Sequence, residues 1–409
     1  MGKVKPLDVT IEQARTYILA YQKLLPPRRL AGKGDIMEYI QMVGCIQFDP
    51  LDVVGRNPDL VLQSRVKGYR PELLEELLYT DRELLDGWDK NMSIYPVADW
   101  PYFTRYRQRA SHKYMGKSEH IKEILPAIKD KLMEDGPLSS LDLNFDKKVA
   151  WAWAPARAGR AALESMYSRG EVVVAHRIGS RKYYGLSEDY LPVKLLNARE
   201  PNPTREDYLC WHIKRRIAGI GLLWDLSGDA WLGIKGLDKQ ARVAAINRLK
   251  DEGQICEVNV AGLKNLFYIS SEAKPLLEEV IEGVVPAKEE SYDEAAIIAP
   301  LDNLLWDRKL IKRLFGFSYV WEVYKPEEER KYGYYVLPVI YGNRFIARFE
   351  PKMVQDEKKL VIKKWWWEDD VDPDPKMARA VMDCLAEFKD YLGAGTVELG
   401  GNFRLLGRR

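Results

Sequence analysis

Cysteine and histidine are scarce in this sequence, which contains four of each among its 409 residues. No two cysteines form a CxxC pair, because they are spread along the chain at Cys45, Cys210, Cys256 and Cys384. This spacing predicts neither a disulfide framework nor a zinc site. The histidines show no metal-ligand spacing either.

The sequence also lacks a long apolar run and a strong net charge. No run approaches membrane-spanning length, and the N-terminal stretch MGKVKP has no apolar signal core, so we expect a cytoplasmic protein without membrane contacts. The formal net charge of +2 does not by itself imply a nucleic-acid partner, so the distribution of charge must decide. A chain of 409 residues is too long for one compact core, and we expect about two to four domains.

A polar pair stands out in the short segment between two predicted helices, residues 44–51. Gln47 and Asp49 would share one face of an extended segment, while Ile46 and Phe48 anchor the other face. The proline after Asp49 disfavours helical backbone there. A carboxylate can accept a proton from water and an amide can orient that water, so the pair suits a hydrolase. The alternative is a solvated strand or a helix cap.

Two stretches of the chain share the order helix, short helix, longer helix, hairpin. In the first, helices at 118–134 and within 147–169 precede a hairpin at 171–186; in the second, helices at 205–219 and 237–252 precede a hairpin at about 254–270. This order is typical of a winged helix-turn-helix unit, which commonly places a helix in a DNA groove. The same unit also serves as a scaffold or a dimer interface.

The composition changes after the last of these hairpins. Residues 294–366 are rich in β-branched and aromatic residues, which predicts a small antiparallel barrel or sheet. The predicted strands include 320–324, 333–341, 345–349 and 360–367. A last helix at about 375–392 and a short strand near Val397 close the chain.

The segment around Gln47 and Asp49, read with a second block, resembles the YcaQ/AlkZ family of winged-helix DNA glycosylases. The first block is residues 45–65, CIQFDPLDVVGRNPDLVLQSR, and the second is residues 299–308, APLDNLLWDR. The match continues through RLFGF at 313–317 and KYGYYVLP at 331–338. The order and spacing fit over roughly residues 10 to 390, which makes the two blocks together a specific signal.

The resemblance implies an α+β fold of three tandem winged helix-turn-helix units plus a small C-terminal antiparallel β-barrel or sheet domain. The domains implied are a first winged-helix unit with the catalytic segment (1–115), a second unit (116–200), a third unit (201–290) and a β-domain with a C-terminal helix (291–409). They would surround a concave basic surface that fits duplex DNA. A monomer is the default for this resemblance.

The implied activity is removal of alkylated bases and unhooking of interstrand crosslinks. The family motif falls on Gln47-Phe48-Asp49, the form with Asp, which resembles the YcaQ branch; the AlkZ branch's restriction to one bulky natural product is not carried over. A purine alkylated at N7 is cationic and already a good leaving group, so we expect Asp49 to act as general base and Gln47 to hold the water. No lysine lies in the motif, so we expect a monofunctional enzyme that needs no cofactor or metal. A bulky crosslink favours an open site over an enclosed base-flipping pocket.

Candidate phosphate contacts are spread over the three units. They are Arg56, Arg177, Arg181, Lys182, Arg215 and Arg216, and for each of them a salt bridge is the alternative. In the second block, Asp302, Trp306, Asp307 and Arg308 are expected to be structural, with a buried Asp–Arg pair.

Two other classes of function compete with the enzyme. One is a transcription-factor-like winged-helix binder without catalysis, and the other is a repair accessory that recognises distorted duplex. Asp49 favours the enzyme, because a carboxylate in a DNA-facing cleft repels phosphate and a pure binder gains nothing from it.

Overall fold

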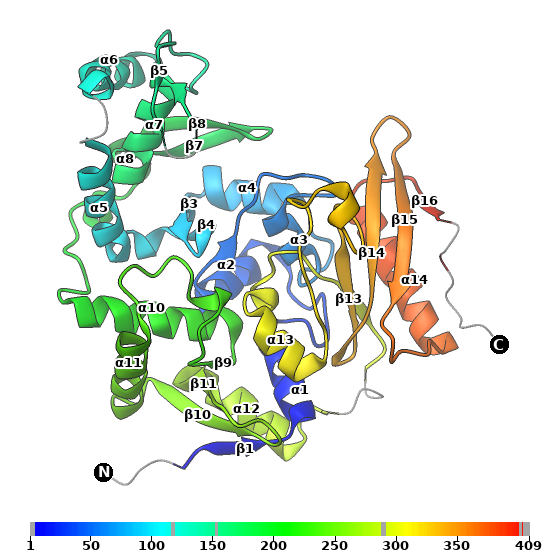
Figure 1. Cartoon of the computed structure of the whole chain (residues 1–409). Coiled ribbons are helices and arrows are strands. Elements are labelled where there is room, and N and C mark those ends of the chain that lie inside the picture. Colours follow the sequence, from blue (N-terminus) through cyan, green and yellow to red (C-terminus); the bar gives the residue numbers. More distant parts are fainter. Residues whose placement is uncertain (1–4, 116–118, 152–153, 288–291, 401–402, 404–409) are drawn as a thin grey trace. The chain divides into compact units, whose positions relative to one another are not determined.

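The computed structural model describes residues 5–115, 119–151, 154–287, 292–400 and 403 (Figure 1). The chain forms two compact units. Unit 1 comprises Met1–Leu74, Trp88–Ser93 and Glu206–Arg409, and unit 2 comprises Glu75–Gly87 and Ile94–Arg205. The predicted domain boundaries at 115/116 and 290/291 fall beside residues outside the described part of the chain, and the division into four domains stays a prediction. Within the described residues, no helix is both long and apolar enough to cross a membrane.

Unit 2 combines helices with a two-stranded hairpin. Its main elements are α5 (Thr104–Met115), α6 (Glu119–Asp135), α7 (Ala158–Arg169), β7 (Val172–Ile178) and β8 (Arg181–Leu186). The predicted hairpin at 171–186 is confirmed, with Val172 opposite Leu186 and Ile178 opposite Arg181. The predicted helix at 118–134 is confirmed from Glu119 onward, whereas Ser118 lies outside the described residues.

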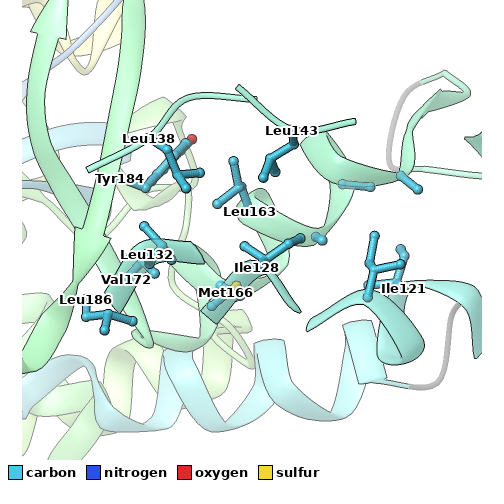
Figure 2. Packing of buried hydrophobic residues seen from close by; sticks show 14 of the residues in the cluster. Ile121, Ile128, Leu132, Leu138, Leu143, Leu163, Met166, Val172, Tyr184 and Leu186 are labelled. Atoms are coloured by element: carbon cyan, nitrogen blue, oxygen red, sulfur yellow. The ribbon is translucent and has the colours of Figure 1, made fainter. Parts of the chain in front are cut away.

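The core of unit 2 lies where α6 and α7 meet the hairpin. Ile128 and Leu132 of α6 face Leu163 and Met166 of α7, and Val172 of β7 lies beside them (Figure 2). Each of these side chains is at most 3% exposed. Burying a side chain of this size stabilises the fold by roughly 1.5–3 kcal/mol, so this cluster fixes the hairpin on its helices.

The N-terminal part of unit 1 carries the predicted polar pair. Its elements are α1 (Ile11–Tyr21), α2 (Gly32–Val43), β2 (Ile46–Gln47), α3 (Asn57–Gln63) and the first residues of α4 (Pro71–Tyr79). The hairpin of β3 (Leu84–Asp89) and β4 (Asn91–Pro96) contributes its turn to the same unit.

A four-stranded sheet joins the N-terminal strand of unit 1 to strands from the middle of the chain. The order is β1-β10-β11-β9, formed by Leu7–Val9, Ile255–Val260, Leu266–Ser270 and Leu223–Trp224. The predicted hairpin at about 254–270 is confirmed as β10 and β11. The helices around it are α10 (Arg205–Ile220), α11 (Lys239–Asp251) and α12 (Lys274–Glu282). The parallel pairing of β1 with β10 brings the N-terminal strand to a hairpin far along the chain (Figure 1).

The C-terminal part of unit 1 is a five-stranded sheet with a helix. The order is β12-β13-β14-β15-β16, formed by Ala295–Ile297, Leu337–Tyr341, Arg344–Val354, Lys359–Trp367 and Thr396–Leu399. The first four strands are antiparallel as predicted, but β15 and β16 are parallel, because α14 (Pro375–Tyr391) returns the chain between them.

One predicted strand of this region is wrong. Residues 320–324 form no strand and belong to a long connection between α13 (Arg308–Phe315) and β13. Just before these residues, Tyr319 is buried in the same connection and donates a hydrogen bond from its hydroxyl to the carbonyl oxygen of Val336 at 2.8 Å. Aromatic and β-branched side chains favour strands, but in this connection the backbone forms no strand hydrogen bonds with a neighbour.

Candidate active site

The segment that carries Gln47 and Asp49 is fixed in unit 1 by its backbone. Helix α2 ends at Gly44, whose φ of +80° suits glycine, and β2 begins two residues later. The amide of Phe48 donates to the carbonyl oxygen of Met92 at 2.9 Å, and Ile46 and Phe48 are 0% and 5% exposed. The predicted extended backbone is confirmed for Ile46 and Gln47, with Ile46 and Phe48 as the apolar anchors.

Asp49 lies just beyond the strand, partly exposed. Its Oδ1 accepts a hydrogen bond from the amide of Leu51 at 2.9 Å, a local turn that orients the carboxylate. Burial raises the pKa of Asp49, and the Leu51 amide lowers it by a smaller amount. A carboxylate of raised pKa is a stronger base than an ordinary surface carboxylate, which suits proton transfer from water.

Gln47 is buried, at 7% exposed. Its Oε1 has no hydrogen-bond partner among the residues that the structure describes. A buried amide oxygen without a donor costs roughly 1–3 kcal/mol, which marks the position as one suited to an incoming donor. Gln47 is thus more buried than Asp49, and its backbone carbonyl oxygen accepts a hydrogen bond from Asn57 Nδ2 at 2.7 Å.

Asn57 joins the two sequence blocks. Its Nδ2 donates to the carbonyl oxygen of Gln47, and its Oδ1 accepts from the amide of Leu301 at 3.0 Å. Asn303 makes a parallel link, because its Nδ2 donates to the carbonyl oxygen of Cys45 at 2.9 Å. The second block thus positions the backbone of the candidate catalytic segment, a role that sequence reasoning did not assign to either asparagine.

The expected buried Asp–Arg pair is present in the same region. Both oxygens of Asp302 accept from Arg65, at 2.8 Å each, and both side chains are 0% exposed. Of the other block residues, Asp307 caps α13 through the amide of Leu310 and accepts from Trp224 Nε1 at 3.0 Å. These contacts hold the block in place, as its predicted structural role requires.

The predicted DNA contacts at Arg215 and Arg216 are engaged inside unit 1. Both arginines bind the buried carboxylate of Asp89, and Arg215 also donates to the carbonyl oxygen of Gly44 at 2.7 Å. Burial raises the pKa of Asp89, but Arg216 and Arg215 outweigh burial and hold it well below its ordinary value. The side chain of Arg216 is 1% exposed, so the salt-bridge alternative describes this pair better than a phosphate contact.

Two further predicted contacts also form internal ion pairs. Arg56 binds Asp59 at 2.7 Å, and Arg177 of unit 2 binds Asp86 at 2.7 Å with both side chains 4% exposed. Both arginines therefore favour the salt-bridge alternative as well, because a phosphate would have to compete with a desolvated carboxylate.

The remaining two predicted contacts lie on strand β8 of unit 2. Arg181 is exposed at the end of the hairpin. Lys182 lies with its Nζ 4.7 Å from the centre of the Tyr167 ring, and burial lowers its pKa to about 8. Of the six predicted cations, Arg181 is the one whose side chain the structure places in solvent.

The segment thus places a partly buried carboxylate two residues from a buried amide, a pair of groups that suits the activation of water. Residues 40–391 match the family model described as DNA glycosylase AlkZ-like. The chain therefore belongs to the AlkZ-like family of DNA glycosylases, as the resemblance of its two blocks predicted.

A solved structure agrees with this family in its fold. Streptomyces sahachiroi DNA glycosylase AlkZ superposes with a TM-score of 0.61 at 15% sequence identity, over 96% of this chain and 99% of that one. At this identity the likeness shows that the two chains share a fold, which here combines helices with mainly antiparallel sheets.

Proposed function

We propose that this protein is a monofunctional DNA glycosylase that hydrolyses the N-glycosidic bond of purines alkylated at N7. The observation that carries the proposal is Asp49: a partly exposed carboxylate whose pKa is raised by burial, within residues 40–391 that match the family model. Its environment suits a base. Among the described residues no cation forms an ion pair with Asp49, so no positive charge lowers the affinity of its carboxylate for a proton.

The reaction follows from the charge of the substrate. A guanine alkylated at N7 carries a positive charge, and breaking its bond to C1′ sends the bonding electrons into the base, which leaves neutral. The sugar gains oxocarbenium character, and the negative charge of Asp49 stabilises it. Asp49 accepts a proton from the attacking water, whose oxygen bonds to C1′ and leaves an abasic site.

Gln47 has a positioning role in this scheme. Its Oε1, buried and without a partner among the described residues, accepts a hydrogen bond from the water that Asp49 deprotonates. Asn57 holds the backbone of Gln47 by a hydrogen bond to its carbonyl oxygen, so the side-chain amide of Gln47 starts from a fixed position. An ordered water loses less freedom on reaction than a mobile one, which lowers the barrier.

The substrate partner would be duplex DNA. Two stretches of the chain support winged helix-turn-helix units, because each has two helices followed by a hairpin: α6, α7 and β7–β8, and α10, α11 and β10–β11. We place a third unit around the segment of Gln47. In this proposal Arg181 and Lys182 on β8 contact the DNA, and the site is open enough to unhook crosslinks. The protein acts as a monomer in the cytoplasm. A binder without catalysis remains the second candidate.

The test is excision of N7-methylguanine from a duplex, followed by alkaline cleavage and gel analysis. Wild type should produce abasic sites without nicking the strand. Asp49→Asn should lower the single-turnover rate by about 100- to 10,000-fold, the usual contribution of a general base, and should keep DNA binding. Gln47→Ala should be milder.

Asp52→Asn is the matched control. Asp52 is a neighbouring exposed carboxylate whose Oδ1 accepts from the amide of Gly55 at 2.9 Å, and asparagine can keep that bond. Equal losses of excision rate in Asp49→Asn and Asp52→Asn would remove Asp49 as the base. Wild-type binding without excision would favour the non-catalytic binder.

A further inference from the structure

The β7–β8 hairpin of unit 2 ends in an exposed apolar side chain. Ile178 is 62% exposed and lies directly opposite Arg181 across the turn. We call residues 178–181 the hairpin tip, and Figure 1 shows it projecting beyond the helices of its own unit. A single exposed isoleucine is common on protein surfaces and by itself assigns no role. The shape of the tip, the rigidity of the hairpin and the charges along it do so.

The hairpin tip is narrow. Only Gly179 and Ser180 join the two strands, and the φ of +59° at Gly179 is the left-handed backbone that such a tight turn requires. A Cβ atom at Gly179 would meet nothing within 4 Å, so the turn faces open space. Because directly opposite residues of paired strands point to the same face, Ile178 and Arg181 stand side by side at the end of the hairpin.

Unit 2 holds the backbone of β7 up to the tip. Arg82 donates hydrogen bonds to the carbonyl oxygens of Val174 and Ala175, at 3.2 and 2.6 Å, where the register of β7 shifts against β8. Further along the same strand, Arg177 pairs with the buried carboxylate of Asp86 at 2.7 Å. The strand is therefore fixed as far as the residue before the tip.

Ring contacts stiffen the pairing of the two strands. The rings of His176 and Tyr183 stack with centroids 4.6 Å apart and an angle of 11° between their planes. The Nζ of Lys182 lies 4.7 Å from the centre of the Tyr167 ring on α7. The side chain of Ile178 is itself stiff, since it branches at Cβ. A preorganised apolar group of this kind loses little conformational freedom when it binds.

The charges along the hairpin indicate what it can bind. Its residues 172–186, VVVAHRIGSRKYYGL, include no acid. Arg181 is exposed and forms no ion pair with the described residues. Asp142 is occupied by Ser139, whose amide and hydroxyl donate to it at 2.7 and 2.8 Å; these bonds lower its pKa most, and Arg181 contributes less. Positive charge around an apolar group fits a partner with phosphates outside and an apolar interior, as a DNA duplex has.

We propose that Ile178 is a wedge that enters the minor groove and partly unstacks one base step, with Arg181 bound at the edge of the groove beside it. Apolar wedges accompanied by basic side chains kink a duplex toward its major groove. This inference rests on the proposed action on duplex DNA and adds a residue outside both sequence blocks. A kink leaves the bases within the duplex, as the proposed open site requires.

The wedge and the arginine act on different parts of the DNA, so their contributions can be separated. Ile178 contacts bases and neutralises no phosphate, whereas Arg181 releases a counterion when it binds. Ile178→Ala should weaken binding by about 3- to 10-fold, as expected for losing part of a buried aliphatic side chain. It should leave the slope of log binding constant against log salt concentration unchanged.

The experiment detects unstacking through 2-aminopurine, whose fluorescence rises when it loses its stacking neighbours. The duplex carries one uncleavable lesion, 2′-fluoro-N7-methylguanosine, and 2-aminopurine replaces one adenine at a time on both sides of it. Saturating wild-type protein should raise the fluorescence at one step of the scan. Ile178→Ala should abolish that rise, Ile178→Leu should retain most of it, and Arg181→Ala should keep it while reducing the dependence on salt.

Val193→Ala is the matched control, because Val193 is also branched at Cβ and is 68% exposed in the same unit, on the short helix α9 (Val193–Leu196). It should keep both the fluorescence rise and the affinity. No rise with wild type at any position would overturn the proposal. A rise that survives Ile178→Ala, or one that Val193→Ala abolishes equally, would do the same.

Excision of N7-methylguanine keeps the two proposals apart. Excision by wild type without any fluorescence rise refutes the wedge alone. A rise that depends on Ile178, without excision, refutes the glycosylase function and supports the wedge.

Discussion

Asp49 and Asp89 belong to the same unit, and their surroundings give the two carboxylates opposite properties. Asp89 is buried with Arg215 and Arg216, and its pKa is held well below the ordinary value. Asp49 is less buried and has one amide as its hydrogen-bond partner, and its pKa is raised. The first carboxylate is committed to its neighbours, whereas the second is available to take a proton.

This contrast distinguishes a carboxylate that is committed to the fold from the one that we propose to be catalytic. A paired carboxylate lowers the energy of the fold and has little affinity left for a proton. A carboxylate that the fold desolvates without a cation costs some stability and gains basicity, the exchange that active sites commonly show.

Removing the charge of Asp89 should have the largest effect. Asp89→Asn leaves two arginines with a buried neutral partner, and breaking a buried pair in this way costs about 3–5 kcal/mol of unfolding free energy. Asp49→Asn should leave the unfolding free energy unchanged or slightly higher, because it removes a desolvated charge. Urea unfolding of both variants measures the difference, and similar stabilities would contradict the assigned roles.

The two carboxylates should also differ in their dependence on pH. Because the folded pKa of Asp89 is depressed, its stabilisation is present above the unfolded value of about 3.9 and is lost only as the pH falls toward the folded pKa. The difference in unfolding free energy between wild type and Asp89→Asn should therefore be constant from about pH 5 to 8 and shrink below about pH 4.

Asp49 should show its pKa in the reaction rate. Since burial raises the pKa of Asp49, the carboxylate protonates at a higher pH than an ordinary aspartate, and single-turnover excision should lose its rate on the acid side with a midpoint above about 3.9. Asp52→Asn should keep that midpoint. A rate that stays flat to lower pH would remove Asp49 as the base.

The sequence revealed the candidate pair because the signal is local. Gln47 and Asp49 alternate with apolar neighbours, and the following proline disfavours a helix, so the residues needed for the inference lie within one short segment. The hairpin of β7 and β8 was predictable for the same reason, from two β-rich runs and the glycine between them.

The partners of the arginines could not be predicted in this way. Arg215 and Arg216 read as a basic helix face, and only the fold brings Asp89 to them from a distant hairpin. The same holds for the pairing of β1 with β10 and for the hydrogen bond between Asn57 and Leu301. Local patterns predict which elements form, whereas tertiary packing decides which charges are left for a ligand.

Asn57 offers a sharper test of how the site is held. Asn57→Ala removes the donor to Gln47 and the acceptor for Leu301, and two lost buried hydrogen bonds should cost about 1–3 kcal/mol of unfolding free energy. Because the backbone of Gln47 is then less fixed, the excision rate should fall by about tenfold or more at saturating enzyme. A variant that is less stable but excises at the wild-type rate would show that Asn57 supports the fold alone.

The smallest effect is expected for the arginines on the hairpin of unit 2, where Arg181 and Arg177 differ as Asp49 and Asp89 do. Arg181 is exposed, whereas Arg177 is committed to Asp86. If Arg181 binds a phosphate, Arg181→Ala should weaken DNA binding a few-fold. It should also reduce the magnitude of the slope of log binding constant against log salt concentration by about 0.9. Arg177→Met should lower stability and leave that slope unchanged, because its charge is already neutralised within the fold. Equal salt slopes in Arg181→Ala and wild type would place the DNA contacts elsewhere than on this hairpin.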